Sequence, residues 1–213
     1  MPFVRPATEP FAVMAPHLRK LPRQARSRER LESLLDAAAD ILEARGIEGL
    51  TITAVAVRTE LPPGSVYEYV ADTRDLVAAV ALRGLDALHR ELVEILALVR
   101  SPGTAREALR AALQLFLVRL RETPGLLEAL AALDADPRLG RIHVDDSRRN
   151  AALLHDSLAS VVPPADRLRL HARCLLLFQL AAGAARLVHA VDGDDAASLT
   201  RELEAILLSL VPV

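Results

Sequence analysis

Apolar residues recur three and four positions apart along most of this chain, which is the spacing of one face of an α-helix. Between residues 81 and 99 the series is Ala81, Leu85, Leu88, Leu92, Ile95 and Val99. Proline and glycine separate the periodic segments, and neither an alternating strand pattern nor an internal repeat is found. Helices are predicted at about 27–44, 51–57, 61–70, 74–98, 105–121, 124–132, 138–161, 165–189 and 196–210. The pattern predicts an all-α protein with short helices up to about residue 72 and longer helices after it.

Residues typical of helix ends mark the boundaries of the short helices. Gly46 stands where a C-terminal cap is expected, directly after Arg45. Thr51 offers a hydroxyl that can cap the next helix, although Ala54 occupies the position of the acid in a capping box. Pro63 suits the first position of the third helix, because the amide at that position has no partner within the helix.

The segment 51–70 gathers small, polar and aromatic residues, whereas most of the chain is aliphatic helix. Two short helical patterns joined by a tight break are typical of a helix-turn-helix whose second helix enters a DNA groove. Gly64 lets the backbone approach a phosphate closely, and the Ser65 hydroxyl can donate to one. Tyr67 and Tyr69 can each touch a thymine methyl or donate to a phosphate. They lie about 200° apart on a helix, so a mainly structural role for one of them stays open.

The composition limits the core to aliphatic residues, since 52% of the chain is hydrophobic but only 3% is aromatic. The net charge of −2 conceals an uneven distribution, because residues 15–30 carry one acid, Glu29, and six basic residues. These six are Arg19, Lys20, Arg23, Arg26, Arg28 and Arg30. A basic arm on an acidic body indicates a polyanionic partner, and a solvated, disordered tail is the alternative.

The cysteine content and the hydropathy favour a cytoplasmic protein with no membrane partner. Cys174 is the only cysteine, which excludes an internal disulfide and fits a reducing compartment. No apolar run reaches the roughly 18 residues that a membrane span needs. Four prolines before residue 17 interrupt any signal-peptide core, and residues 1–13 are assigned no structure.

The sequence offers no convergent set of catalytic or metal-binding residues. His143 and Ser147 lie one helical turn apart, but no oxyanion-hole glycine motif surrounds them. The run Asp145-Asp146 followed by two arginines is interpreted as a solvated charged face. Cys174 lies in leucine-rich sequence and is expected to be buried and inert. The protein is therefore expected not to be an enzyme and to carry neither metal nor cofactor.

Residues 28–76 resemble the DNA-binding domain of the tetracycline-repressor (TetR) family of bacterial transcription regulators. The resemblance rests on Ala37-Ala38, Ile41, Arg45-Gly46, Thr51-Ile52, Val55-Ala56, Gly64-Ser65-Val66-Tyr67-x-Tyr69 and Leu76. The chain departs from the family where Glu60 replaces a turn glycine and where Pro62-Pro63 replaces Ser-Lys. Phosphate attraction within the motif is thereby weakened, and we expect the basic arm to compensate. The expected DNA-binding residues are Arg26, Arg28, Thr51, Pro63, Gly64, Ser65, Tyr67, Tyr69 and Arg74.

The resemblance also implies a domain plan with about nine helices. A disordered extension would cover 1–22, a three-helix DNA-binding domain 23–72, and a helical effector-binding and dimerisation domain 73–213. The last two helices would pair in a homodimer that binds a palindromic operator. Candidate effector contacts are Phe116, Arg119, His143, Asn150, Cys174 and Phe178, and the scarcity of aromatic residues hints at a mostly apolar effector.

The expected function is a ligand-responsive DNA-binding regulator, taken as a repressor that a small molecule releases from its operator. The sign of the coupling is not determined by the sequence, so activation stays open. The alternative is an all-α small-molecule-binding protein or enzyme without a DNA-binding role.

Overall fold

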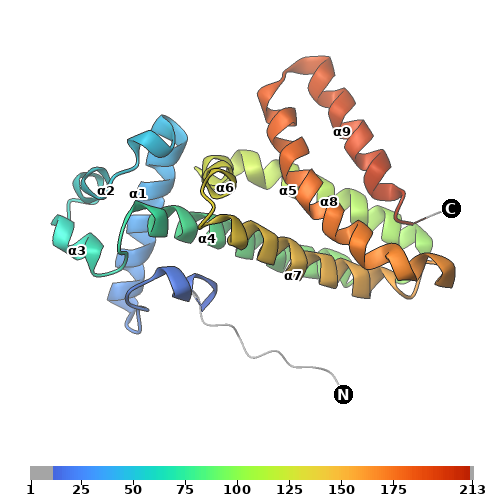
Figure 1. Cartoon of the computed structure of the whole chain (residues 1–213), viewed down its shortest axis with the longest axis horizontal. Coiled ribbons are helices and arrows are strands. Elements are labelled where there is room, and N and C mark those ends of the chain that lie inside the picture. The colour runs from blue at the N-terminus through green and yellow to red at the C-terminus, as the bar shows by residue number, and fades with distance from the viewer. Residues whose placement is uncertain (1–11, 212–213) are drawn as a thin grey trace. The chain divides into compact units, whose positions relative to one another are not determined.

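The computed structural model describes residues 12–211 of the 213-residue chain, and this part contains helices and no strand (Figure 1). The elements are a 3₁₀ helix, η1 (Ala12–His17), and the α-helices α1 (Ala25–Gly49), α2 (Ile52–Arg58), α3 (Pro63–Tyr67), α4 (Thr73–Leu96), α5 (Pro102–Glu122), α6 (Leu126–Ala135), α7 (Gly140–Leu158), α8 (Pro164–Ala190) and α9 (Gly193–Leu208). Each predicted helix overlaps an observed one. The all-α prediction is confirmed.

The chain divides into two compact units, each built from two stretches of sequence. Unit 1 comprises the residues up to Asp86 together with Pro124–Gly140, and unit 2 comprises Ala87–Thr123 and the chain from Arg141 onward. Unit 1 therefore holds α1, α2, α3, α6 and the first part of α4. Unit 2 holds the rest of α4 with α5, α8, α9 and nearly all of α7. The functional domains expected at 23–72 and 73–213 stay a prediction, since this division follows packing alone.

Helix α1 buries a leucine-rich face in unit 1 and is interrupted at Gly46. Leu31, Leu34, Leu35 and Leu42 are completely buried, in accordance with the apolar spacing of the segment. Gly46 has φ 64, so the helical geometry breaks at the glycine that was expected to end the helix. One further turn carries the chain to Gly49.

Gly125 allows the start of α6 to lie directly against the backbone of α1. Its φ is 64, and a Cβ atom at this position would lie 2.4 Å from the carbonyl oxygen of Ala39. Both the left-handed backbone and the lack of space require glycine here. The contact between α1 and α6 in unit 1 therefore depends on one residue without a side chain.

The N-terminal segment differs from the disordered extension expected for residues 1–22. Residues 12–17 form η1, and the side chains of Met14 and Leu18 are only 3% and 9% exposed. Pro22 is buried as well. The burial of these apolar side chains in unit 1 accounts for the order. The first eleven residues lie outside the described part of the chain.

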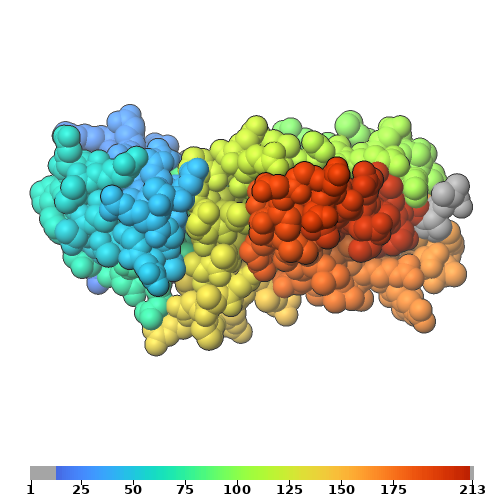
Figure 2. Space-filling view, turned by 90° about the horizontal axis from the view of Figure 1, so that it is seen from above, coloured from blue at the N-terminus to red at the C-terminus, as the bar shows by residue number. Residues whose placement is uncertain are grey.

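Unit 2 has an aliphatic core, and a capping motif fixes the start of one of its helices. The core cluster includes Leu96, Leu109, Leu158, Leu170 and Cys174. Ser101 and Thr104 form a reciprocal capping box at the start of α5. Helices α8 and α9 pack on each other, and Figure 2 shows them side by side over one face of unit 2. Across residues 12–211, none of the helices combines the length and hydropathy that crossing a bilayer requires.

Candidate DNA-binding interface and effector site

Helices α2 and α3 form a helix-turn-helix with the caps expected from the sequence. The Oγ1 atom of Thr51 accepts a hydrogen bond from the Ala54 amide at 3.0 Å and caps α2. Pro63 occupies the first turn of α3, where its missing N–H is not needed. Glu60 in the turn has φ 55, the left-handed region that costs a non-glycine residue about 1–2 kcal/mol. This is the position at which the resemblance expects glycine.

Helix α3 exposes Gly64 and Tyr67 while it buries Val66. Gly64 has no neighbour within 4 Å of an added Cβ, and the Tyr67 side chain is 45% exposed. Val66 is completely buried and holds the helix on unit 1. Ser65 is half-buried beside them. The arrangement leaves the backbone and side chains at the start of α3 accessible to a groove.

Tyr69 is a core residue, so the expected contact between its ring and DNA does not hold in this structure. Its side chain is only 2% exposed, and its hydroxyl lies 3.4 Å from the Ser27 carbonyl oxygen, to which it donates. Burial raises the pKa of Tyr69. The 200° separation from Tyr67 had required that only one of the two could face a ligand, and burial selects Tyr67.

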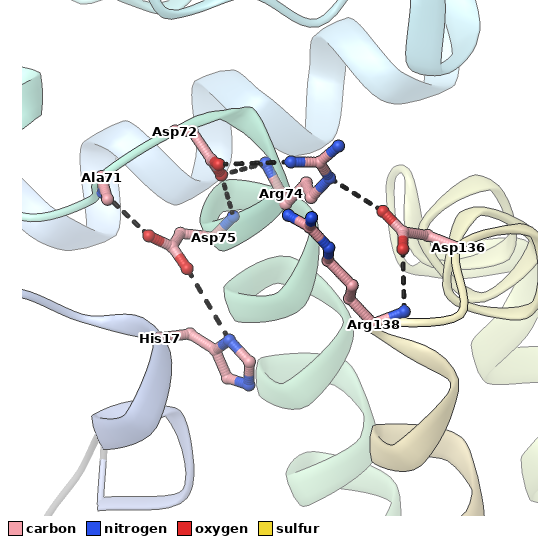
Figure 3. A network of polar contacts seen from close by, with 7 residues as sticks. All are labelled: His17, Ala71, Asp72, Arg74, Asp75, Asp136 and Arg138. Atoms are coloured by element: carbon pink, nitrogen blue, oxygen red, sulfur yellow. Dashed lines mark hydrogen bonds and ion pairs between the residues drawn. The ribbon is translucent and has the colours of Figure 1, made fainter.

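Arg74, expected to contact a phosphate, is held by two carboxylates in unit 1 (Figure 3). Its Nε atom donates to Oδ2 of Asp136 at 2.9 Å, and its Nη1 atom lies 3.6 Å from Oδ2 of Asp72. The backbone amide of Arg138 donates to Asp136 and is the main reason why the pKa of Asp136 is lowered, with Arg74 acting in the same direction. A phosphate would have to displace these carboxylates from the guanidinium.

The basic arm contains cations in different environments. Arg19 and Lys20 contact residues 67–69, and the Nη2 atom of Arg28 donates to the carbonyl of Arg23 at 3.3 Å. Arg26 is exposed, and it forms no ion pair with any residue between 12 and 211. Of the two arm residues expected to contact DNA, Arg26 is thus the more accessible cation.

Four of the six expected effector contacts lie outside the polar cluster of unit 2, two on α5 and two at the aliphatic core on α8. Arg119 forms a two-pronged ion pair with Glu91, with N–O distances of 3.0 and 2.9 Å. Cys174 is completely buried, and burial raises the pKa of its thiol to about 12, as expected for an inert cysteine. Phe178 packs against the aliphatic core, and Phe116 is half-buried elsewhere on α5.

His143 and Asn150 belong to a buried polar cluster of unit 2 that also includes residues not anticipated from the sequence. Among the described residues, the buried polar side chains are His89, His143, Ser147 and Asn150, all on α4 or α7. The Nδ2 atom of Asn150 donates to Asp146 at 2.9 Å, which orients the amide. Its Oδ1 atom therefore accepts from Nδ1 of His89 at 2.7 Å. Gln179 of α8 donates to the Ser147 hydroxyl at 2.7 Å.

Asp146 corrects the interpretation of residues 145–149 as a solvated charged face. The Asp145 and Arg148 side chains are 69% and 64% exposed, but Asp146 is only 11% exposed. Burial raises the pKa of Asp146 even though Arg149 pulls in the opposite direction. The spacing 143, 147, 150 on one helical face was the available sequence signal for this cluster, whereas the approach of His89 and Gln179 required the fold.

The chain matches two models of one protein family, one on each side of residue 86. Residues 34–80 match the bacterial regulatory proteins of the tetR family, and residues 103–209 match the tetracyclin repressor-like C-terminal domain. The second match alone covers about half of the chain. The protein belongs to the TetR family of transcriptional regulators, and DNA binding is the role of the α2–α3 motif in this family. A comparison with curated proteins gave no match.

Solved structures of the same family share the fold. A TetR-family transcriptional regulator from Streptomyces coelicolor is 28% identical, with a TM-score of 0.65 over 85% of this chain and 96% of that chain. The multidrug binding protein EbrR, complexed with imidazole, is 21% identical, with a TM-score of 0.59 over 86% of this chain and 96% of that one. The repressor AlkX from Dietzia, implicated in biodegradation of n-alkanes, is 20% identical, with a TM-score of 0.52 over 84% and 93%.

Proposed function

We propose that the protein is a homodimeric repressor that binds a palindromic operator through α3 and is released by a small molecule bound in unit 2. The observation that carries the proposal is the surface of α3. Gly64 and Tyr67 are exposed, and Ser65 is half-buried, around the completely buried Val66. A short helix anchored in this way can present its first turn to base edges and phosphates. The reducing cytoplasm stays the proposed location.

The proposed DNA contacts surround the first turn of α3. The exposed backbone at Gly64 allows a phosphate to approach closely, and Thr51 and Pro63 are exposed on either side of the turn. Tyr67 supplies an apolar ring for a thymine methyl and a hydroxyl for a phosphate. Arg26 and Arg28 add charge from the basic arm, whereas Arg74 would contribute only after release from Asp136.

An exposed leucine face on α8 supports the proposed homodimer. Leu176, Leu180 and Leu187 are 61%, 60% and 50% exposed and lie within about 40° of one another around the helix. Ile206 of α9 is 52% exposed. Large apolar side chains gathered on one helical face are typical of a protein–protein interface. A second copy of the chain would cover this face and place two recognition helices on a two-fold operator.

The buried polar cluster supports an effector site in unit 2. Buried polar side chains reduce stability unless they are hydrogen-bonded, and here they lie among aliphatic helices. His89, Asn150 and Ser147 could exchange their present partners for a hydrogen-bonding group on an otherwise apolar molecule. We therefore retain the mostly apolar effector and add one polar group to it.

DNA selection followed by affinity measurement tests the proposed function. The wild-type protein is used to select duplexes from a random library, and binding is compared between a selected and a scrambled duplex. We expect Tyr67→Ala to weaken binding of the selected duplex by about tenfold and to leave the scrambled duplex nearly unaffected. Ile47→Ala is the matched control, because Ile47 in unit 1 is 47% exposed and lies outside α2 and α3. A folded wild-type protein that selects no duplex would favour the alternative without a DNA-binding role.

A further inference from the structure

We infer that residues 13–22, here called the N-terminal clamp, hold the C-terminal end of the recognition helix, with Arg19 as the positioning residue. The clamp is a structural feature of unit 1 in its own right, and only its consequence for DNA rests on the proposed function. In this arrangement the first cations of the basic arm contact residues of the protein itself rather than a DNA phosphate.

Three apolar residues anchor the clamp in unit 1. Met14, Leu18 and Pro22 are buried, and they are spaced four residues apart along the segment. Burying side chains of the size of Met and Leu removes apolar surface from water, which favours one position of the segment. The segment between these anchors is therefore held in place, and its polar groups are presented in defined positions.

Arg19 supplies one hydrogen bond to the last residue of α3 and one to the turn that follows it. Its backbone amide donates to the Tyr69 carbonyl at 2.8 Å, and its Nη1 atom donates to the Tyr67 carbonyl at 3.2 Å. The last carbonyls of a helix lack partners within the helix and need donors from elsewhere. Arg19 thus acts as a C-terminal cap delivered from 48 positions earlier in the chain.

Two side-chain contacts align the clamp along the segment 68–75. Lys20 lies 3.8 Å from the Glu68 carboxylate, and Nδ1 of His17 lies 3.7 Å from Oδ1 of Asp75. Figure 3 shows His17 directed towards Asp75. The Lys20–Glu68 pair is exposed and contributes little on its own, whereas the His17 and Asp75 side chains are each only 23% exposed. Together with the hydrogen bonds of Arg19, these contacts show that the clamp is antiparallel to residues 68–75. The clamp therefore lies along the segment that follows the recognition helix.

Helix α3 needs such support because it is only five residues long. Isolated helices shorter than about 12 residues are marginal in water, so the orientation of α3 depends on its tertiary contacts. Val66 fixes the buried side of the helix, and the clamp fixes its C-terminal end. Loss of the clamp should therefore misplace Tyr67 relative to a base edge without removing any cation that faces a phosphate.

Substitutions that act through different atoms test the clamp on the full chain. The Arg19→Ala variant loses a hydrogen bond, whereas the Met14→Ala variant loses an apolar anchor and no charge. We expect each variant to bind the selected duplex with about fivefold lower affinity. The affinity for a scrambled duplex and the slope of log affinity against log salt should not change. Arg19→Lys should restore part of the loss. Arg26→Ala is the matched control and should weaken both duplexes and reduce the slope by about one.

Two outcomes of the DNA measurement would overturn the inference. If Arg19→Ala weakens both duplexes equally and lowers the salt slope by about one, Arg19 is a phosphate contact. If Met14→Ala and Arg19→Ala both bind like the wild type, the clamp has no positioning role.

Hydrogen exchange tests the clamp in the absence of DNA. It can therefore show that the clamp inference is wrong even if the proposed DNA-binding function is right, and the reverse. We expect amides in a peptide spanning 65–70 to exchange about fivefold faster in Arg19→Ala and Met14→Ala, while peptides from α8 are unchanged. Unchanged exchange at 65–70 in both variants would overturn the clamp, whether or not the wild-type protein binds DNA.

Discussion

The Nε atom of Arg74 donates to Oδ2 of Asp136 across 2.9 Å, although 62 positions separate the two residues (Figure 3). The pair joins the start of α4, directly after the recognition helix, to the residue that follows α6. Asp136 also accepts from the backbone amide of Arg138, so its carboxylate organises both segments of unit 1.

Neutralising Asp136 is expected to destabilise the protein at neutral pH. The pKa of Asp136 is lowered in the folded state, first by the Arg138 amide, so its stabilising effect is present above the unfolded pKa of about 4 and is lost as pH falls through the folded pKa. Urea unfolding should show Asp136→Asn less stable than the wild type at neutral pH, with the difference shrinking below about pH 4. Glu43→Gln, at an exposed acid of α1, is the control and should change little. A difference that persists in acid would contradict the electrostatic explanation.

Neutralising Asp146 is expected to have the opposite effect. Burial raises the pKa of Asp146, so the wild type is favoured below the unfolded pKa of about 4 and loses stability as pH rises through the folded pKa. Asp146→Asn keeps an acceptor for Asn150 and should be more stable than the wild type at neutral pH, with the gap closing in acid. Urea unfolding against pH measures both effects. The same substitution at the neighbouring, exposed Asp145 should show no such pH-dependent gain.

A cation on the exposed face of α8 is expected to prevent dimer formation. Leu180→Arg would place a charge in the interface proposed for a second copy, and light scattering should report a monomer. Its affinity for a palindromic duplex should fall by about a hundredfold, since the two half-sites are no longer bound together. Leu98→Arg alters a leucine that is 70% exposed in the connection between α4 and α5, outside α8 and α9, and should leave the dimer intact. A dimeric Leu180→Arg variant would rule out this face as the interface.

A methyl group at Gly125 is expected to separate α6 from α1. The Cβ atom of an alanine would approach the Ala39 carbonyl oxygen to 2.4 Å with a left-handed backbone, and we expect a loss of about 3 kcal/mol in the free energy of unfolding. Gly193→Ala provides the control, because Gly193 has φ +60 but nothing within 4 Å of its Cβ position. The control should lose only about 1 kcal/mol from backbone strain. If the two variants lose the same free energy of unfolding in denaturant, the close approach to Ala39 does not cause the loss.

The helices and their ends were predictable because they depend on local chemistry. The apolar spacing and the helix-turn-helix pattern predicted each of the nine α-helices within residues 12–211 but not η1, and Thr51 and Pro63 occupy the cap positions that were assigned to them. Gly46 breaks α1 as expected, although one more turn follows. The family was identified for the same reason, since the motif residues lie within one continuous segment, 28–76.

The site was less predictable where residues distant in sequence meet. Tyr67 and Tyr69 are chemically alike, and only packing against unit 1 buries one of them. Asp145 and Asp146 look alike in sequence, but the helical face of α7 turns Asp146 towards His89. No local pattern indicated that Gln179 of α8 would donate to Ser147.

The sequence by itself determined the all-α fold, the helix-turn-helix and the family, because periodicity, caps and a contiguous motif act over a few residues. The tertiary structure alone decided which charged groups are accessible. Arg74 is paired with Asp136, and Arg19 caps the recognition helix, although both are cations in or beside a DNA-binding motif. Charge is a property of the residue, but its availability depends on partners that the fold brings from 48 to 62 positions away.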